Sequence, residues 1–202
     1  MQQKLIRNIW AVGRNYADHA AEMKAEVPKA PMIFLKAGTS AEAGSKITLP
    51  KWSKDVHYEL ELAYRIDENL SFSHITLALD LTARDAQAEA KNSGAPWTLA
   101  KSFVGSCPMG SWVSLDEIAN SEEIHFNLKI NKQLKQSGHS KSMIFSPEIL
   151  LQYVKNHFPV VASDVLLSGT PSGVGSLTSG DNLEATLQSE GRTLLTCIWD
   201  VE

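Results

Sequence analysis

The sequence contains few of the residues that mark several common classes of protein. Its 202 residues include only two cysteines, Cys107 and Cys197, which lie far apart and form no Cys-x-x-Cys pair. That count argues against a zinc ribbon and a disulfide framework, and we expect two buried thiols. No apolar run approaches the roughly 20 residues that span a bilayer, and the N-terminus lacks the pattern of a signal peptide. We therefore expect no membrane partner and a cytoplasmic location.

Clustered positive charge is also missing. The 19 Lys and Arg residues are scattered among 23 Asp and Glu residues, which gives a net charge of -4. This distribution argues against a nucleic-acid partner. A chain of this length can bury one substantial core, so we expect a single domain over residues 1–202.

Short strand-like stretches dominate what the sequence does contain. Alternating or compact apolar patterns predict strands, and amphipathic stretches with suitable ends predict helices. The expected strands are 8–12, 32–36, 56–66, 77–82, 123–131, 164–168, 183–188 and 193–201, and the expected helices are 16–24, 84–92 and 147–157. The pattern predicts a strand-rich α+β fold.

An acidic pair lies within the expected strand 56–66. Glu59 and Glu61 alternate with apolar residues, so both side chains should project from one face of the strand. Asp80 offers a third carboxylate, and three carboxylates without a thiolate favour Mg²⁺ or Mn²⁺ over zinc. The same alternation is also typical of a half-buried strand whose acidic residues face solvent, and that alternative stays open.

A histidine and a glutamate share one face of the expected helix 16–24. His19 and Glu22 are three positions apart, so the carboxylate can orient the imidazole as a general base. A surface helix with an incidental His and Glu is the more ordinary explanation of the pattern taken alone, and that alternative stays open. Residues 25–31 are rich in Ala, Lys and Pro, so residues 14–31 are expected to form a mobile lid helix and its connection, with a short rigid loop as the alternative.

The glycine-rich stretch 169–175 permits two interpretations. It lacks the Gly-Lys-Ser/Thr ending of a phosphate-binding loop, and no long helix pattern follows it. We expect instead a tight turn that brings backbone N–H groups close to a ligand.

Several stretches, in this order, resemble the fumarylacetoacetate hydrolase family. The resemblance covers nearly the whole chain and is nearest to the short, single-domain bacterial acylpyruvate hydrolase and oxaloacetate decarboxylase branch. The stretches are VGRNYADHAAE at 12–22, FLK at 34–36, HYELEL at 57–62, LDLTARDAQ at 79–87, APW at 95–97, AKSF at 100–103, SCP at 106–108, SGTPSGVG at 168–175 and GD at 180–181.

The resemblance implies a fold and a set of residue roles. The fold would be a mixed β-sandwich roll of the fumarylacetoacetase C-terminal-domain type, assembled as a homodimer. The residues with implied roles are the metal ligands Glu59, Glu61 and Asp80, the catalytic groups His19, Glu22 and Lys101, and the substrate-binding residues Arg14, Gln87 and Thr170.

The resemblance also implies an enzyme that acts on small 2-oxo acids. The preferred function is metal-dependent hydrolysis of the C–C bond of acylpyruvates, such as acetylpyruvate or fumarylpyruvate, to pyruvate and a carboxylic acid. The alternatives at the same metal site are oxaloacetate decarboxylation or tautomerisation, and isomerase or hydratase chemistry of aromatic catabolism. A non-catalytic binding protein is a further alternative.

Three departures from the family pattern affect these expectations. Only eighteen residues separate Glu61 from Asp80, because the segment 67–76 is short, and this shortening could displace the third ligand. Val104 replaces the usual Asp after Lys-Ser-Phe, and Ala37 stands where Pro often follows Phe-x-Lys. The last two departures concern residues around the proposed ligands and leave the ligands intact.

Overall fold

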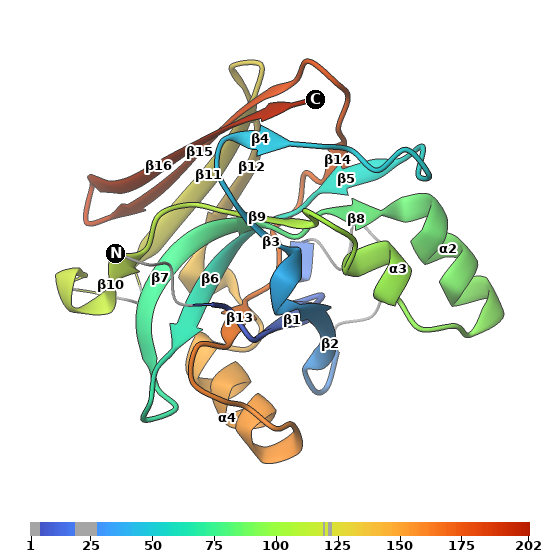
Figure 1. Cartoon of the computed structure of the whole chain (residues 1–202). Coiled ribbons are helices and arrows are strands. Elements are labelled where there is room, and N and C mark those ends of the chain that lie inside the picture. The colour runs from blue at the N-terminus through green and yellow to red at the C-terminus, as the bar shows by residue number, and fades with distance from the viewer. Residues whose placement is uncertain (1–4, 19–27, 119, 121–122) are drawn as a thin grey trace.

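The computed structural model describes residues 5–18, 28–118, 120 and 123–202. Strands outnumber helices (Figure 1). The helices are α2 (Arg84–Ser93), α3 (Thr98–Lys101) and α4 (Pro147–His157), with 3₁₀ turns at Gly38–Ser40, Leu115–Glu117 and Ser140–Ser142. The strands are β1 (Asn8–Gly13), β2 (Met32–Ala37), β3 (Ala41–Ala43), β4 (Lys46–Ile47), β5 (Val56–Tyr58), β6 (Leu60–Ile66), β7 (Phe72–Leu79), β8 (Thr82–Ala83), β9 (Cys107–Met109), β10 (Val113–Ser114), β11 (Ile124–Ile130), β12 (Gln133–His139), β13 (Val165–Leu167), β14 (Gly175–Ser176), β15 (Asn182–Ser189) and β16 (Arg192–Val201).

The strands form three sheets, of which the two larger are mixed and the smallest is antiparallel. The eight-stranded sheet has the order β2-β1-β13-β6-β7-β9-β3, and β10 pairs with β7 beside this path. The five-stranded sheet has the order β12-β11-β15-β16-β4, and a small sheet joins β14, β5 and β8. Most pairs are antiparallel, whereas β1 with β13, β3 with β9 and β16 with β4 are parallel. This arrangement confirms the expected strand-rich α+β class.

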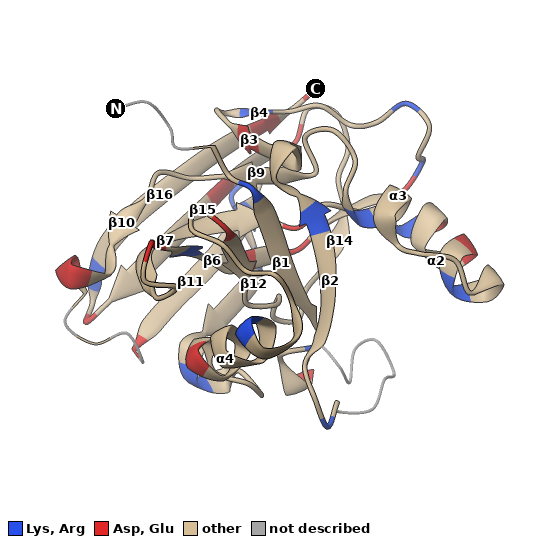
Figure 2. Cartoon of the chain, turned by 60° about the horizontal axis from the view of Figure 1, so that its bottom comes forward, with Lys and Arg blue, Asp and Glu red and all other residues tan. Residues whose placement is uncertain are grey.

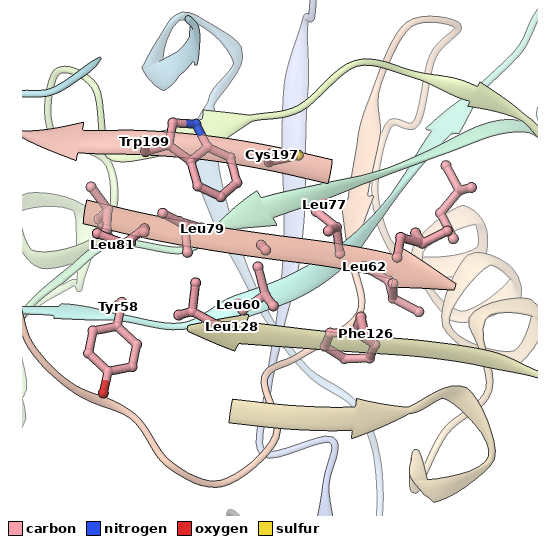
Figure 3. Packing of buried hydrophobic residues seen from close by; sticks show 14 of the residues in the cluster. Tyr58, Leu60, Leu62, Leu77, Leu79, Leu81, Phe126, Leu128, Cys197 and Trp199 are labelled. Carbon is pink, nitrogen blue, oxygen red and sulfur yellow. The ribbon is translucent and has the colours of Figure 1, made fainter. Parts of the chain in front are cut away.

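The main hydrophobic core lies between the two larger sheets. Leu62 and Leu77 from the larger sheet meet Phe126 and Leu187 from the five-stranded sheet in one buried cluster, and Figure 3 shows part of this packing. Each of these side chains is at most 1% exposed. Burial of apolar surface on this scale is the principal favourable contribution to folding. The packing of the two sheets against each other confirms the expected sandwich.

Two expected strands have different boundaries in the structure. The predicted strand 56–66 is two strands, β5 and β6, which are separated at Glu59. The break occurs because the backbone N–H of Leu60 donates to the side chain of Gln136 and the carbonyl of Glu59 accepts from Asp80, so neither group joins a regular ladder. The predicted strand 77–82 ends at Leu79, where β7 ends, and β8 begins separately at Thr82.

Strand β12 was not predicted from the sequence. Its residues, QLKQSGH, are mostly polar and lack the apolar alternation of a half-buried strand. The strand forms because β11 supplies backbone partners along it, with one bulge at Lys135, after a turn in which Asn131 and Lys132 both have positive φ. Positive φ at both central residues is typical of a type I′ hairpin turn.

Two of the three predicted helices fall within the described residues, and both are present as α2 and α4. Helix α4 has the predicted bounds, with Pro147 in its first turn and the Ser146 hydroxyl as its N-cap acceptor. Helix α2 extends one residue beyond the prediction and ends at Gly94, which has a left-handed conformation. Residues 19–27, which include most of the third predicted helix, 16–24, and half of the proposed lid, 14–31, lie outside the described residues.

Charged residues are spread over the fold rather than concentrated. Figure 2 shows Lys and Arg side by side with Asp and Glu on the outer helices and on several strands. Across the described ranges, no helix is both long and apolar enough to cross a membrane. The spread of charge over the fold agrees with the scattered charge of the sequence.

Candidate active site

The hairpin between β6 and β7 brings three carboxylates together. Leu60 pairs with Leu79 in this hairpin, so Glu59 and Asp80, the next residues outward, lie side by side, and Glu61 follows on β6. One carboxylate oxygen of each acidic residue lies within 4.8 Å of the others. Residues 67–71 form the turn of the hairpin and residues 72–76 already belong to β7. The short segment therefore leaves Asp80 beside Glu59, and the displacement of the third ligand that the sequence left open does not occur.

All three carboxylates are buried. Glu59, Glu61 and Asp80 are 5%, 1% and 0% exposed. The alternative in which the acidic residues face solvent is therefore wrong, because the surrounding sheets cover both faces of β6. Three buried like charges repel one another strongly unless cations or protons compensate for them.

Lys101 supplies part of this compensation from the end of α3. Its Nζ donates to Glu59 Oε2 at 2.8 Å, to Asp80 Oδ2 at 2.5 Å and to Thr82 Oγ1 at 2.6 Å. Burial alone would lower the pKa of Lys101, but the adjacent Asp80 and Glu59 carboxylates outweigh it and raise the pKa. The ammonium group therefore stays charged and holds two of the carboxylates in fixed positions.

Two further cations were not predicted as site residues. Lys36 on β2 is fully buried, and its Nζ donates to Asp80 Oδ1 at 2.7 Å and to the carbonyl of Lys101. Hydropathy along β2 would place Leu35 inside and Lys36 outside, whereas Leu35 is 47% exposed. The only signal for Lys36 in the sequence was its place in the Phe-Leu-Lys stretch of the resemblance.

Arg84 is the second of these cations and begins helix α2. Its guanidinium pairs with Glu59 Oε1, and its Nη1 donates to Gln87 Oε1 at 2.9 Å. Arg84 therefore holds the side chain of Gln87 close to the carboxylate of Glu59. The only indication of Arg84 in the sequence is its place in the LDLTARDAQ stretch of the resemblance, which assigns it no role.

Glu61 has a different environment from the other two acids. Its Oε2 accepts a hydrogen bond of 2.6 Å from the backbone N–H of Gly169. Burial, together with the charges of Asp80 and Glu59, raises the pKa of Glu61 well above its ordinary value. Gly169 has a φ of +90°, and an added Cβ would lie 2.7 Å from the Cβ of Asn15, so only glycine fits this turn. The glycine-rich stretch is thus a tight turn that presents a backbone N–H to this carboxylate.

Gln136 connects this turn to the break at Glu59. Its Nε2 donates to Thr170 Oγ1 at 2.8 Å and to the carbonyl of Pro171 at 2.9 Å, while its Oε1 accepts from Leu60 N at 2.9 Å. Thr170 in turn donates to the carbonyl of Leu60 at 2.9 Å. No pattern in the sequence indicates Gln136, because this residue belongs to the unpredicted strand β12.

A small cavity of about 70 Å³ lies over the acidic cluster. Arg14, Gln87, Lys101 and Thr170, all named from the sequence, line it together with the three carboxylates, and Arg84, Lys91, Phe34 and Trp97 also contribute. His19 and Glu22 lie outside the described residues. A larger cavity of about 1310 Å³ shares no lining residue with this site.

The donor set fits a hard divalent cation. Glu59, Glu61 and Asp80 could hold such an ion, since their oxygens converge within a buried pocket that no thiolate enters as a ligand. Cys107 is buried, and burial raises its pKa to about 12. Cys197 is likewise buried and free, which confirms the expectation of two buried thiols.

Comparison with known proteins places this fold and site in context. The family model described as fumarylacetoacetate (FAA) hydrolase C-terminal matches residues 8–197. Human oxaloacetate tautomerase FAHD1, a mitochondrial protein, is 40% identical over 190 residues, which cover 89% of this chain and 86% of that protein. A crystal structure from Oleispira antarctica, assigned to fumarylacetoacetate isomerase/hydrolase, is 38% identical with a TM-score of 0.94 and covers 100% of this chain and 96% of that one.

A third comparison bears on the fold alone. The crystal structure of fumarylpyruvate hydrolase from Pseudomonas aeruginosa, in complex with Mn²⁺ and pyruvate, is 24% identical. It superposes with a TM-score of 0.90 and covers 100% of this chain and 92% of that one. With the family model matching most of its length, the chain belongs to the fumarylacetoacetate hydrolase family.

Proposed function

We propose that this chain is a metal-dependent oxaloacetate tautomerase, which interconverts the keto and enol forms of oxaloacetate. The observation that carries the proposal is the 40% identity to human oxaloacetate tautomerase over 89% of the chain. This choice departs from the acylpyruvate hydrolase preferred from the sequence alone and takes up one of its alternatives.

The charge of the cavity supports an anionic substrate. Four cationic side chains, Arg14, Arg84, Lys91 and Lys101, line it beside the three carboxylates. Burial lowers the pKa of Lys91, and the neighbouring charges of Arg84, Arg14 and Lys101 lower it further. A bound dication would add to this positive potential, and oxaloacetate carries two carboxylates that it would attract.

The residues of the chain then have distinct tasks. Glu59, Glu61 and Asp80 would hold Mg²⁺ or Mn²⁺, which would supply a Lewis acid for negative charge on the oxygens of a 2-oxo acid. Arg14 and Gln87 bind the substrate at the rim of the cavity. Lys101 keeps two of the ligand carboxylates oriented.

The proton transfer itself is assigned to the pair named from the sequence. Tautomerisation moves a proton between carbon C3 and the C2 oxygen of oxaloacetate. We propose that His19, oriented by Glu22, accepts the proton from C3 and that the enol oxygen is protonated from solvent. A base of this kind is effective because the pKa of an imidazole lies near neutral pH.

A direct assay tests this function. The decay of enol-oxaloacetate is followed by its ultraviolet absorbance with purified protein, with and without Mg²⁺. We expect a metal-dependent acceleration that EDTA abolishes and that His19→Ala reduces by about 10²-fold or more. An unchanged decay rate in the presence of metal-loaded protein would exclude the tautomerase.

Acylpyruvate hydrolysis is the second candidate, favoured by the resemblance to the Oleispira antarctica isomerase/hydrolase structure. Cleavage of the C3–C4 bond needs an attacking water in addition to the groups used for tautomerisation, and the same His19–Glu22 pair would activate it. Release of pyruvate from acetylpyruvate, measured beside the tautomerase assay, separates the two functions. If the protein cleaves acetylpyruvate faster than it tautomerises oxaloacetate, hydrolysis becomes the first candidate function.

Location remains a proposal. We propose a cytoplasmic protein, whereas the human relative is named as mitochondrial. Fractionation of the cells that make the protein tests the location.

A further inference from the structure

A second group of metal-binding side chains lies away from the acidic cluster, at the edge of the five-stranded sheet. His125 on β11 and His139 on β12 are directly opposite each other in the antiparallel ladder. Their rings stack with a centroid distance of 4.1 Å and an interplanar angle of 3°. Glu123, immediately before β11, places its Oε2 at 3.2 Å from His139 Nε2.

We propose that Glu123, His125 and His139 form a second metal site, which binds a borderline divalent transition metal such as Zn²⁺ or Ni²⁺. One ligand atom from each of the three residues lies within 4.8 Å of the others. Two ligands about 2.1 Å from a tetrahedral ion are roughly 3.3 Å apart, close to the distance between Glu123 Oε2 and His139 Nε2. Two imidazoles and one carboxylate form a ligand set that zinc uses in proteins.

The side chains can reach this arrangement with small movements. Parallel stacking directs the ring nitrogens side by side, so one ring must rotate about its χ2 bond to aim at a shared ion, and this torsion has a broad minimum. His125 is exposed, so rotation of its ring away from the stack on His139 displaces no buried side chain. Lys141 pairs with the other oxygen of Glu123, Oε1, and so leaves Oε2 directed at the histidine.

The surroundings leave room for an ion and its remaining ligands. A cavity of about 350 Å³ is lined by both histidines and by Asp18, Ser137 and Ser142. Water molecules in this space could complete the coordination, since an open zinc site with three protein ligands keeps a position for water. The ion would also be accessible from solvent, because the side chains of Glu123 and His139 are 35% and 27% exposed.

The proposed site differs in chemistry from the acidic cluster. Imidazole ligands favour zinc, nickel and copper, whereas an all-carboxylate set favours magnesium and manganese. The cavity also borders Pro171 and Ser172, which continue the turn whose Gly169 N–H bonds Glu61. Residues of one loop therefore border both sites.

Zinc titration of the full chain tests the proposal. Calorimetric titration with ZnCl₂ in excess Mg²⁺ is compared for the wild type, His125→Ala and His139→Ala. We expect each variant to bind one equivalent fewer, or to bind that equivalent at least about tenfold more weakly. His157→Ala is the matched control, since His157 lies on α4 and stacks on Tyr153, and it should behave as wild type. Equal stoichiometry and affinity in His125→Ala and wild type would overturn the proposal.

A second measurement needs no variant. Imidazole resonances of the wild-type chain are followed by NMR while Zn²⁺ is added. The resonances of His125 and His139 should shift together at one equivalent, whereas those of His74 and His157 should stay in place. Shifts at all histidines alike, or at neither member of the pair, would contradict a specific site.

Discussion

Lys36 is a fully buried lysine whose charge has one carboxylate partner, Asp80. Loss of one member of a buried ion pair typically costs about 3–5 kcal/mol, and the lower end of that range applies here because Asp80 keeps Lys101 as a second partner. We therefore predict that Lys36→Met lowers the free energy of unfolding by about that amount in metal-free protein, as measured by urea denaturation.

Lys46 provides a matched control for this prediction. It pairs with Glu202 at the surface, where both side chains are more than half exposed. Exposed pairs contribute at most about 1 kcal/mol, so Lys46→Met should change the unfolding free energy little. Equal losses of unfolding free energy in Lys36→Met and Lys46→Met would show that the buried pair contributes no more to stability than the exposed pair.

The raised pKa of Glu61 predicts how metal binding depends on pH. In metal-free protein, the folded chain retains a proton on Glu61 that the unfolded chain releases, so stability falls as pH rises from the ordinary carboxyl range through the raised pKa. A cation competes with that proton. The increase in Tm caused by Mg²⁺ should therefore grow with pH over this range, as measured by thermal unfolding.

Glu61→Gln is the control for the pH dependence. The glutamine side chain has a similar shape and cannot ionise, so the increase in Tm should be smaller and should not depend on pH through this group. A wild-type Mg²⁺ effect that stays constant across the range would contradict the role assigned to Glu61.

At the scale of elements, strand β12 positions the site through a single side chain. Gln136 satisfies the Leu60 N–H at the break between β5 and β6 and also holds the turn at Thr170 and Pro171. We predict that Gln136→Leu lowers stability by about 1–3 kcal/mol, because buried polar groups lose their partners. We also expect a lower kcat/KM for oxaloacetate, because Glu59 and the turn that contacts Glu61 are no longer held together.

Gln133→Leu on the same strand is the comparison. Gln133 is exposed, and its side chain accepts only a long hydrogen bond of 3.3 Å from Lys135. Its replacement should leave both unfolding and kinetics near wild type. If Gln136→Leu retains wild-type kcat/KM, the strand does not position the site.

At the scale of the whole molecule, the resemblance implies a homodimer, which remains a prediction. Ile198 on β16 is 53% exposed and, with Trp112, lines the cavity of about 1310 Å³. Contiguous apolar surface is typical of a protein interface, whereas single exposed apolar side chains are common, so we take Ile198 as one part of such a surface. We predict a mass of twice 22.2 kDa by light scattering, reduced to the monomer by Ile198→Glu.

Leu134→Glu separates this effect from a general loss of solubility. Leu134 on β12 is 61% exposed and does not line the groove, so this variant should keep the wild-type mass. A wild-type chain that is monomeric at all concentrations would exclude the dimer.

The sequence by itself determined the fold class, helix α4 and most strand positions, because apolar periodicity and end signals act locally. It also identified Glu59, Glu61 and Asp80 as a cluster, although periodicity alone left open whether these acids face solvent.

Only the tertiary structure decided that the three acidic side chains are buried and which cations compensate for their negative charge. Strand β12 depends on backbone partners from β11, so its polar sequence carries no signal. Lys36 and Arg84 reach the carboxylates across sequence separations of 44 and 25 residues. Hydropathy cannot indicate a buried cation, because its burial is favourable only where distant carboxylates already stand.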